Sequence, residues 1–236
     1  MPTIPRLFVP MPLAPGVTIA GTAAQAHYLG TVLRRQPPDP VHLFNGRDGE
    51  WHARIATLHR DRVTLTVEIQ RRPQQPEPDL WLVFAMLKRD ATDHVVEKAT
   101  ELGVSALHPV LTERTNAARV NLDRLAAITI EAAEQCERLT VPVIHEPRRL
   151  PDLLHDWPAG RPLFAATERS PAAIPLRPTA VPAALLVGPE GGFTVTELEA
   201  LVRHPFVTPV SLGPRILRAE TVCVAGLALL QASLCG

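Results

Sequence analysis

The sequence is poor in lysine, aromatic residues and cysteine. Lys88 and Lys98 are its only lysines, and it has one Tyr, three Trp and six Phe. So few aromatic side chains argue against an extended stacking platform for single-stranded nucleic acid. The three cysteines form no Cys-x-x-Cys pair, so neither a disulfide framework nor a zinc site is indicated. If the chain acts on nucleic acid, backbone shape and charge should therefore matter more than stacking.

Long apolar runs and phosphate-binding motifs are also missing. The apolar segment 221–236 is interrupted by Gln231 and is too short for a membrane span, which favours a buried helix or an oligomer interface. No glycine loop ends in Gly-Lys-Ser/Thr, and none has the Gly-x-Gly-x-x-Gly spacing of dinucleotide sites. The proline-rich start argues against an ordinary secretory signal. We expect a soluble, cytoplasmic protein that uses neither a membrane nor a metal.

The net charge of the whole chain is zero, but its N-terminal part has an excess of positive charge. Residues 1–75 hold nine Arg and five acidic residues, a net of +4, and the remainder has a net of −4. The basic excess at this end suits a module that docks on RNA. An ordinary solvated surface could carry the same charge, so both interpretations stay open.

Hydrophobic patterning divides the chain into two modules. Short strand-like runs fill residues 1–72, and the alternation of Val63, Leu65, Val67 and Ile69 predicts a strand with one buried face. We predict a small β-barrel over 1–72, with a helix near 20–34, and a proline-rich linker over 73–79.

Over 80–236, predicted strands alternate with predicted helices, which indicates an α/β domain with a mainly parallel sheet and helices on both faces. The expected strands are 80–87, 106–111, 141–144, 163–167, 184–187 and 207–212. The expected helices are 92–102, 121–138, 150–156, 195–204 and 219–234.

A glycine loop at 188–192 is the most informative local feature. It follows the apolar run 185–187, and Thr194 and Glu197 behind it have the spacing of a capping box, so a helix should begin there. Glycines permit positive φ or close approach of a ligand. A second strand and glycine turn follow at 207–217. Both turns come after strands, where ligands bind in parallel sheets.

Five ordered blocks of the chain resemble motifs of the RsmE family of ribosomal RNA methyltransferases. Gly188–Phe193 reads Gly-Pro-Glu-Gly-Gly-Phe, and Leu212–Thr221 matches the pattern Leu-Gly-x-Arg-Ile-Leu-Arg-x-Glu-Thr. The other three blocks are His27–Arg34, Lys98–Gly103 and Glu131–Arg138. The likeness runs from about residue 6 to residue 221, which is nearly the whole chain.

The resemblance implies properties that periodicity does not reveal. It implies a C-terminal SPOUT-type domain with a deep trefoil knot, an otherwise rare feature, and an N-terminal PUA-like RNA-binding barrel. It also implies a homodimer that methylates N3 of a uridine in small-subunit (16S) ribosomal RNA with S-adenosylmethionine as cofactor. The cofactor-binding residues implied are Thr167, Leu186, Val187, Gly188, Gly191, Gly192, Ser211, Leu212, Gly213, Ile216 and Leu217.

Catalysis at uridine N3 requires loss of the imide proton, and a nearby base or a cation beside the carbonyl oxygens would help. Arg218 directly follows the second glycine turn and is the candidate cation, although pairing with Glu220 is an equally open role. Glu190 suits either a base or a brace for the loop backbone, and the base stays open. The residues expected to contact RNA are Arg6, Arg34, Arg35, Lys88 and Lys98.

Two departures from the family pattern and three alternatives remain. Residues 37–40 replace a glycine-containing turn, and Val222 stands where a small residue is usual.

One alternative function is that of a SPOUT enzyme that methylates another RNA atom, such as a ribose 2′-hydroxyl. Another is an inactive RNA-binding ribosome assembly factor, which intact glycine loops disfavour. The third, a nucleotide hydrolase, lacks its phosphate motif.

Overall fold

The computed structural model describes residues 4–115, 120–167, 172–177 and 181–232 and divides the chain into two compact units. The first unit comprises Met1–Pro76 and Ala133–Val141, and the second comprises Glu77–Ala132 and Pro142–Gly236. The sequence predicts a linker over 73–79 and places residues 133–141 in the α/β domain that follows it. This segment belongs with the first unit because its backbone is hydrogen-bonded there, as described below.

The first unit is built on a five-stranded sheet with the order β1-β3-β4-β5-β2. Its strands are β1 Arg6–Phe8, β2 Thr18–Gly21, β3 Pro40–Phe44, β4 Glu50–Leu58 and β5 Val63–Arg72. Only the β1–β3 pair is parallel. The helix expected near 20–34 is a short α1, Ala23–His27, continued by a π-helix, η1, Tyr28–Val32. Thr22 and Gln25 form the capping box that starts it.

The predicted alternation of β5 holds over its first part only. Val63, Leu65 and Val67 are buried, but Ile69 is 65% exposed. The ladder between β4 and β5 shifts register between His52 and Ala53, which lie opposite Ile69 and Val67. A shift in register changes which face a side chain occupies. The placement of Ile69 on the buried face was therefore wrong.

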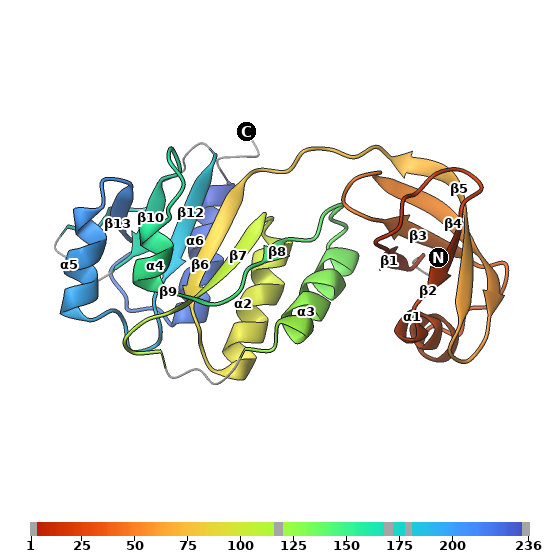
Figure 1. Cartoon of the computed structure of the whole chain (residues 1–236), viewed down its shortest axis with the longest axis horizontal. Helices are drawn as coiled ribbons and strands as arrows, with labels where there is room; N and C mark the ends of the chain where they lie inside the picture. The colour runs from red at the N-terminus through yellow and green to blue at the C-terminus, as the bar shows by residue number, and fades with distance from the viewer. Residues whose placement is uncertain (1–3, 116–119, 168–171, 178–180, 233–236) are drawn as a thin grey trace. The chain divides into compact units, whose positions relative to one another are not determined.

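The second unit has a parallel sheet with the strand order β11-β13-β10-β12-β6-β7-β8, and β9 pairs with β7 (Figure 1). The strands are β6 Leu80–Ala85, β7 Ala106–Leu111, β8 Val143–Ile144, β9 Arg148–Arg149, β10 Leu163–Ala166, β11 Ile174–Pro175, β12 Ala183–Val187 and β13 Val207–Ser211. Every strand pair of this sheet in the described residues is parallel. The predicted α/β class is thereby confirmed.

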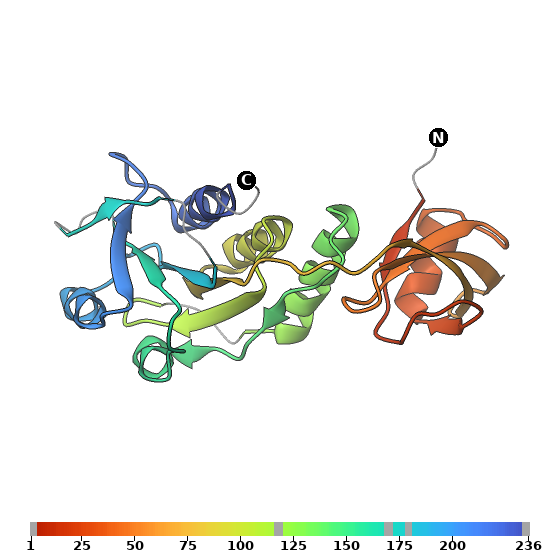
Figure 2. The ribbon, with the colours of Figure 1, turned by 90° about the horizontal axis from the view of Figure 1, so that it is seen from above.

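Helices cover both faces of this sheet, as predicted (Figure 2). They are α2 Arg89–Glu101, α3 Leu122–Gln135, α4 Leu150–His155, α5 Val195–Arg203 and α6 Ala219–Gln231. The α2 and α6 side chains pack on the face that presents Leu82 and Phe84, and those of α4 and α5 pack on the face of Val83 and Ala85. Alternate residues of β6 thus enter two cores, which explains its nearly continuous apolar sequence.

Helix α6 lies close against β12 because Gly226 has no side chain. A Cβ at Gly226 would lie 2.7 Å from Cδ2 of Leu185. The helix buries Val222, Cys223 and Leu227. This contact fixes α6 beside the strand that leads into the first glycine loop.

Among the helices of the described residues, none has the length and apolar character that a membrane span requires.

Candidate functional site

The carboxyl ends of three neighbouring strands meet at one edge of the second unit's sheet. Ala166 at the end of β10 lies opposite Val187 of β12 on one side and Val210 of β13 on the other. The two glycine turns therefore leave the sheet next to each other, as expected for ligand sites in parallel sheets. A cavity of about 1070 Å³ opens there, bounded also by the first residues of α2 and α6.

Seven of the predicted cofactor residues line this cavity, and four do not. The seven are Thr167, Val187, Gly188, Gly191, Gly192, Ile216 and Leu217. Leu186 points into the core on the α4 and α5 face instead, because alternate strand residues face opposite sides. Ser211, Leu212 and Gly213 lie outside the lining. The Ser211 hydroxyl there accepts the Gly213 N–H at 3.2 Å and so shapes the turn.

Thr167 lines the cavity and has a buried hydroxyl. Its backbone N–H donates to the Val210 carbonyl at 3.0 Å, which fixes the residue at the end of β10. Its Oγ1 is buried and has no hydrogen-bond partner in the described part of the chain. A buried hydroxyl without a partner is costly. A ligand in the cavity that bonded to this atom would remove that cost.

The first glycine loop is shaped by Phe193. A Cβ at Gly188 would lie 2.9 Å from the buried Phe193 ring, so no larger residue fits without a shift. Gly192 has a φ of 69° and donates its N–H to the Pro189 carbonyl at 2.8 Å. This tight turn places the backbone of Gly191 and Gly192 along the cavity.

The helix after this loop begins with the predicted capping box. The Glu197 N–H donates to Thr194 Oγ1 at 3.2 Å, and the Thr194 N–H donates to Glu197 Oε2 at 2.8 Å. The other oxygen of the buried Glu197 carboxylate accepts the N–H of Glu113 at 2.9 Å. Spacing predicted the first two bonds, whereas only the fold brings Glu113 to this carboxylate.

Several cations surround the cavity. Arg218, at the N-cap of α6, has a side chain that is 86% exposed, and its nearest carboxylate is that of Glu220 at 3.9 Å. Lys88 stands at the N-cap of α2 and is also part of the lining. Arg114 donates to the Gly191 carbonyl at 2.8 Å, a placement that sequence reasoning missed. No local spacing signal connects Arg114 with a loop 77 residues away.

Glu190 lies beside Lys88. Its Oε1 is 3.5 Å from the Lys88 backbone nitrogen, at the limit of a hydrogen bond. This geometry is that of the bracing carboxylate considered from the sequence.

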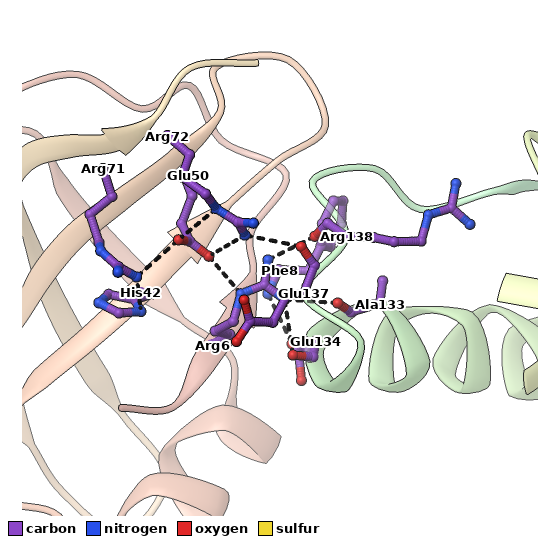
Figure 3. A network of polar contacts seen from close by, with 10 residues as sticks. All are labelled: Arg6, Phe8, His42, Glu50, Arg71, Arg72, Ala133, Glu134, Glu137 and Arg138. Atoms are coloured by element: carbon purple, nitrogen blue, oxygen red, sulfur yellow. Dashed lines mark hydrogen bonds and ion pairs between the residues drawn. The ribbon is translucent and has the colours of Figure 1, made fainter. Parts of the chain in front are cut away.

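Arg6 lies inside the first unit, where it closes the end of α3 (Figure 3). Its Nε donates to Glu50 Oε1 at 2.6 Å, and Nη1 and Nη2 donate to the carbonyls of Ala133 and Arg138 at 2.8 and 2.7 Å. The Ala133 carbonyl belongs to the last turn of α3, whose final acceptors are not satisfied by the helix itself, and Arg138 lies just beyond the helix. Arg6 is buried, so the structure gives it a structural role in place of the expected phosphate contact.

Glu50 is the centre of this network and is 1% exposed (Figure 3). It also accepts hydrogen bonds from Arg71 at 3.1 Å and from Arg72 at 3.0 Å. Burial raises the pKa of Glu50, but the hydrogen bonds from Arg72 and Arg6 outweigh burial, so its pKa lies below the ordinary value. Burial, aided by the charge of Arg71, lowers the pKa of the neighbouring His42 to about 4.

The remaining predicted RNA contacts differ in availability. Arg34 is exposed and has a φ of 54° at the end of η1, and Arg35 is half-buried. Lys98 forms ion pairs with Glu97 at 2.9 Å and Glu101 at 2.8 Å, and hydrogen bonds to Glu101 and Glu97 raise its pKa to about 12. Its charge is thus neutralised by its own helix, and it lies outside the cavity lining.

In the described ranges, no group of three or more His, Cys, Asp or Glu side chains is arranged to hold a metal ion.

Comparisons with known proteins agree with this geometry. The ribosomal RNA small subunit methyltransferase E of Rickettsia conorii is 35% identical over 214 residues, which cover 86% of this chain and 84% of that protein. A crystal structure of the methyltransferase of the same name from Neisseria gonorrhoeae, bound to S-adenosyl methionine, aligns with a TM-score of 0.88 at 29% identity and covers 98% of each chain. A methyltransferase of Legionella pneumophila in complex with the same cofactor aligns with a TM-score of 0.86 at 28% identity, again over 98% of each chain.

Family matches cover both units. Residues 22–68 match the family described as the RNA methyltransferase PUA domain. Residues 74–231 match the family described as the RNA methyltransferase domain. The expected SPOUT-type and PUA-like character of the two parts is thereby confirmed, and the chain belongs to the RNA methyltransferase family with an N-terminal PUA domain.

Proposed function

We propose that this protein transfers a methyl group from S-adenosylmethionine to N3 of a uridine in small-subunit (16S) ribosomal RNA. The observation that carries the proposal is the cavity at the strand ends, which Thr167 and the glycines of the first glycine loop line together. Related proteins named for small-subunit ribosomal RNA methylation, and related structures bound to this cofactor, support it.

The residues of the cavity suit S-adenosylmethionine. Its adenine ring is flat and has polar edges, and Val187, Ile216 and Leu217 offer apolar walls for the ring faces. Thr167 Oγ1 offers a free hydrogen-bonding group, and Gly191 and Gly192 expose main chain without side-chain obstruction. Mostly apolar linings with a few convergent polar groups are typical of cofactor sites.

The sulfonium of the cofactor supplies an already activated methyl group, so the transfer needs no metal. With the cofactor bound, the uridine N3–H would give its proton to a base or to solvent water, the N3 electron pair would take the methyl group, and S-adenosylhomocysteine would be the leaving group. Negative charge spreads onto the uridine carbonyl oxygens as the proton leaves. Arg218 is the cation proposed to stabilise this charge, since it lines the cavity and its one ion pair within the described residues is the long contact with Glu220, at 3.9 Å.

RNA docking is assigned to the first unit, with Arg34 and Arg35 as phosphate contacts and Lys88 contributing from the second unit. The PUA match over 22–68 includes both arginines and supports this division of labour. We also propose a cytoplasmic location, because the proposed substrate is ribosomal RNA.

We also propose that the protein acts as a homodimer with α6 at or beside the two-fold interface. The helix buries one face in its own unit but leaves Leu229 41% exposed next to Ala228, which is also exposed. Small and apolar residues on an outer helix face permit self-complementary packing. Sedimentation should give twice the chain mass. An active monomer would contradict the dimer.

Methylation of 16S RNA within isolated small subunits tests the function. With labelled S-adenosylmethionine, we expect one methyl group on a uridine base, located by reverse-transcription arrest because N3 methylation blocks base pairing. Label on a ribose hydroxyl would favour another RNA methyltransferase activity. RNA binding without cofactor binding in calorimetry would favour an assembly factor, and binding of ATP instead would favour a nucleotide hydrolase.

A further inference from the structure

The loop after β7 is fastened to the first glycine loop at two points. The buried Glu197 carboxylate accepts the N–H of Glu113 at 2.9 Å while it also accepts the N–H of Thr194 at 2.8 Å. One residue later, Arg114 Nη1 donates to the Gly191 carbonyl at 2.8 Å. The Glu113 backbone and the neighbouring Arg114 side chain are thus held against a segment about 80 residues away in sequence. Such double attachment restricts where the Arg114 guanidinium can lie.

A second hollow of about 480 Å³ lies beside these attachments. Its apolar floor consists of Met86 and Leu87, which are buried, and its polar rim holds two cations, Lys88 and Arg114, and two carboxylates, Glu113 and Glu190. Lys88, Arg114, Glu190 and Gly191 also line the large cavity, so the two hollows adjoin. The volume is in the range of small-molecule sites, roughly 300–1,000 Å³.

The two cations of this rim are not engaged in ion pairs within the described residues, although Glu113 and Glu190 share the rim with them. Neither Lys88 nor Arg114 makes an ion pair with a carboxylate anywhere in the described ranges, in contrast to Lys98 with its two. Arg114 uses one N–H on a neutral carbonyl, and a guanidinium has five donors. Free guanidinium donors in a fixed orientation are suited to phosphate oxygens.

We propose that the second hollow receives a nucleotide of the acceptor RNA, that Arg114 contacts its phosphate, and that Glu197 is the positioning residue that holds Arg114 in place. The inference rests on the proposed methyl transfer and names the RNA subsite of that same site. The apolar floor accommodates the ribose or base, and the adjoining large cavity holds the cofactor.

Arg114→Ala tests the phosphate contact in the full-length protein with 16S RNA in small subunits. We expect the KM for RNA to rise about tenfold, since a charge-assisted hydrogen bond is lost. The slope of log affinity against log salt should flatten by about 0.7–0.9, the value for one phosphate contact. The affinity for S-adenosylmethionine should change less than about twofold.

Glu197→Gln tests the positioning role. Each oxygen of the Glu197 carboxylate accepts one backbone N–H, from Glu113 or from Thr194. A glutamine amide has one acceptor oxygen, and its NH₂ group cannot accept a hydrogen bond, so one of the two attachments is lost. We expect the KM for RNA to rise in the same direction as in Arg114→Ala. In the Arg114→Ala background, the same substitution should raise KM no further, because both act through one contact. Glu199→Gln is the matched control, since Glu199 is 63% exposed and pairs only with Arg203 on α5.

The outcomes separate this inference from the function on which it rests. If the unaltered protein does not methylate the 16S RNA, the proposed function itself is refuted. Normal methylation, together with an unchanged KM and salt slope in Arg114→Ala, refutes the RNA subsite alone. A loss of cofactor affinity with an unchanged salt slope would show that Arg114 only braces Gly191, and would also overturn the proposal. Additive effects of the two substitutions would refute the role of Glu197.

Discussion

The two parts of the molecule use their charged residues in opposite ways. Residues 1–75 have a net charge of +4, yet Arg6, Arg71 and Arg72 converge on one buried carboxylate, that of Glu50. The rest of the chain has a net charge of −4, yet at the edge of its main cavity Arg114 has no ion pair in the described residues, and Arg218 has only a long one with Glu220, at 3.9 Å.

This difference shows that the net charge of a segment does not locate its available cations. A charge inside a fold has to be paired because its desolvation is costly. A charge at the rim of a cavity keeps its hydration and stays free to meet a ligand. The basic composition of the first unit is therefore partly structural, and the acidic composition of the second does not prevent it from binding an anion.

The strongest way to break the comparison is to remove the centre of the buried network. Glu50→Ala leaves three guanidinium groups without their carboxylate and should lower the free energy of unfolding by about 3–5 kcal/mol. Urea unfolding followed by circular dichroism measures it. Glu68→Ala is the control, since Glu68 pairs with the half-exposed Arg54 at 2.9 Å and should cost about 0–1 kcal/mol. An equal decrease in the free energy of unfolding in the two variants would mean that the buried Glu50 network stabilises the fold no more than an exposed ion pair does.

Arg218 tests the opposite kind of arginine. Arg218→Ala should lower kcat about 10²–10³-fold, the usual effect of removing one charge-stabilising group from an active site. Folding stability and cofactor affinity should hardly change, because the side chain is 86% exposed. Arg215→Ala, an exposed neighbour outside the cavity lining, is the control. A normal kcat in Arg218→Ala would remove Arg218 from the mechanism.

The first glycine loop should be sensitive to volume where Phe193 limits it. Gly188→Val forces a side chain against the Phe193 ring and should weaken S-adenosylmethionine binding at least about tenfold, an overpacking effect of 1–3 kcal/mol. Gly191→Ala makes only an ordinary contact, 3.5 Å from Cδ of Arg114, and should bind nearly normally. Calorimetry compares the two. Unaltered affinity in a folded Gly188→Val variant would contradict the assignment of this loop to the cofactor.

Acid should weaken the first unit in two steps. The pKa of His42 falls from 6.5 in the unfolded chain to about 4 in the fold, so only the unfolded chain takes up a proton between these values. The contribution of His42 to the free energy of unfolding is therefore fully present above pH 6.5 and is lost as the pH falls towards about 4. Glu50, whose pKa is lowered, extends the loss to still lower pH. His42→Gln should flatten only the first step in urea unfolding at pH 7, 5 and 4.

The smallest effect is expected from single exposed arginines of the first unit. Arg34→Ala should flatten the salt dependence of RNA affinity by about 0.7–0.9, since one phosphate contact is lost. Arg54→Ala should leave the slope nearly unchanged, because Arg54 is engaged by Glu68. Filter binding to small subunits over a range of salt concentrations would measure both. Identical slopes in the two variants would place the RNA contact elsewhere.

Features that depend on neighbours in sequence were predicted well. The Thr194–Glu197 capping box, the alternating strands and helices of the second unit and the two glycine turns all appeared near their expected positions. The cavity between the turns also followed, because parallel strands deliver their carboxyl ends to one edge. The trefoil knot implied by the family resemblance stays a prediction.

The sequence by itself determined the local elements and, through its ordered motifs, the family, because capping, alternation and glycine turns act over a few residues. Only the tertiary structure decided that Arg6 closes a helix end 127 residues away, that Arg114 reaches Gly191, and that Ile69 faces solvent. These outcomes depend on which distant backbone groups remain unsatisfied and on strand register. No spacing rule records them, because they arise when separate elements pack together.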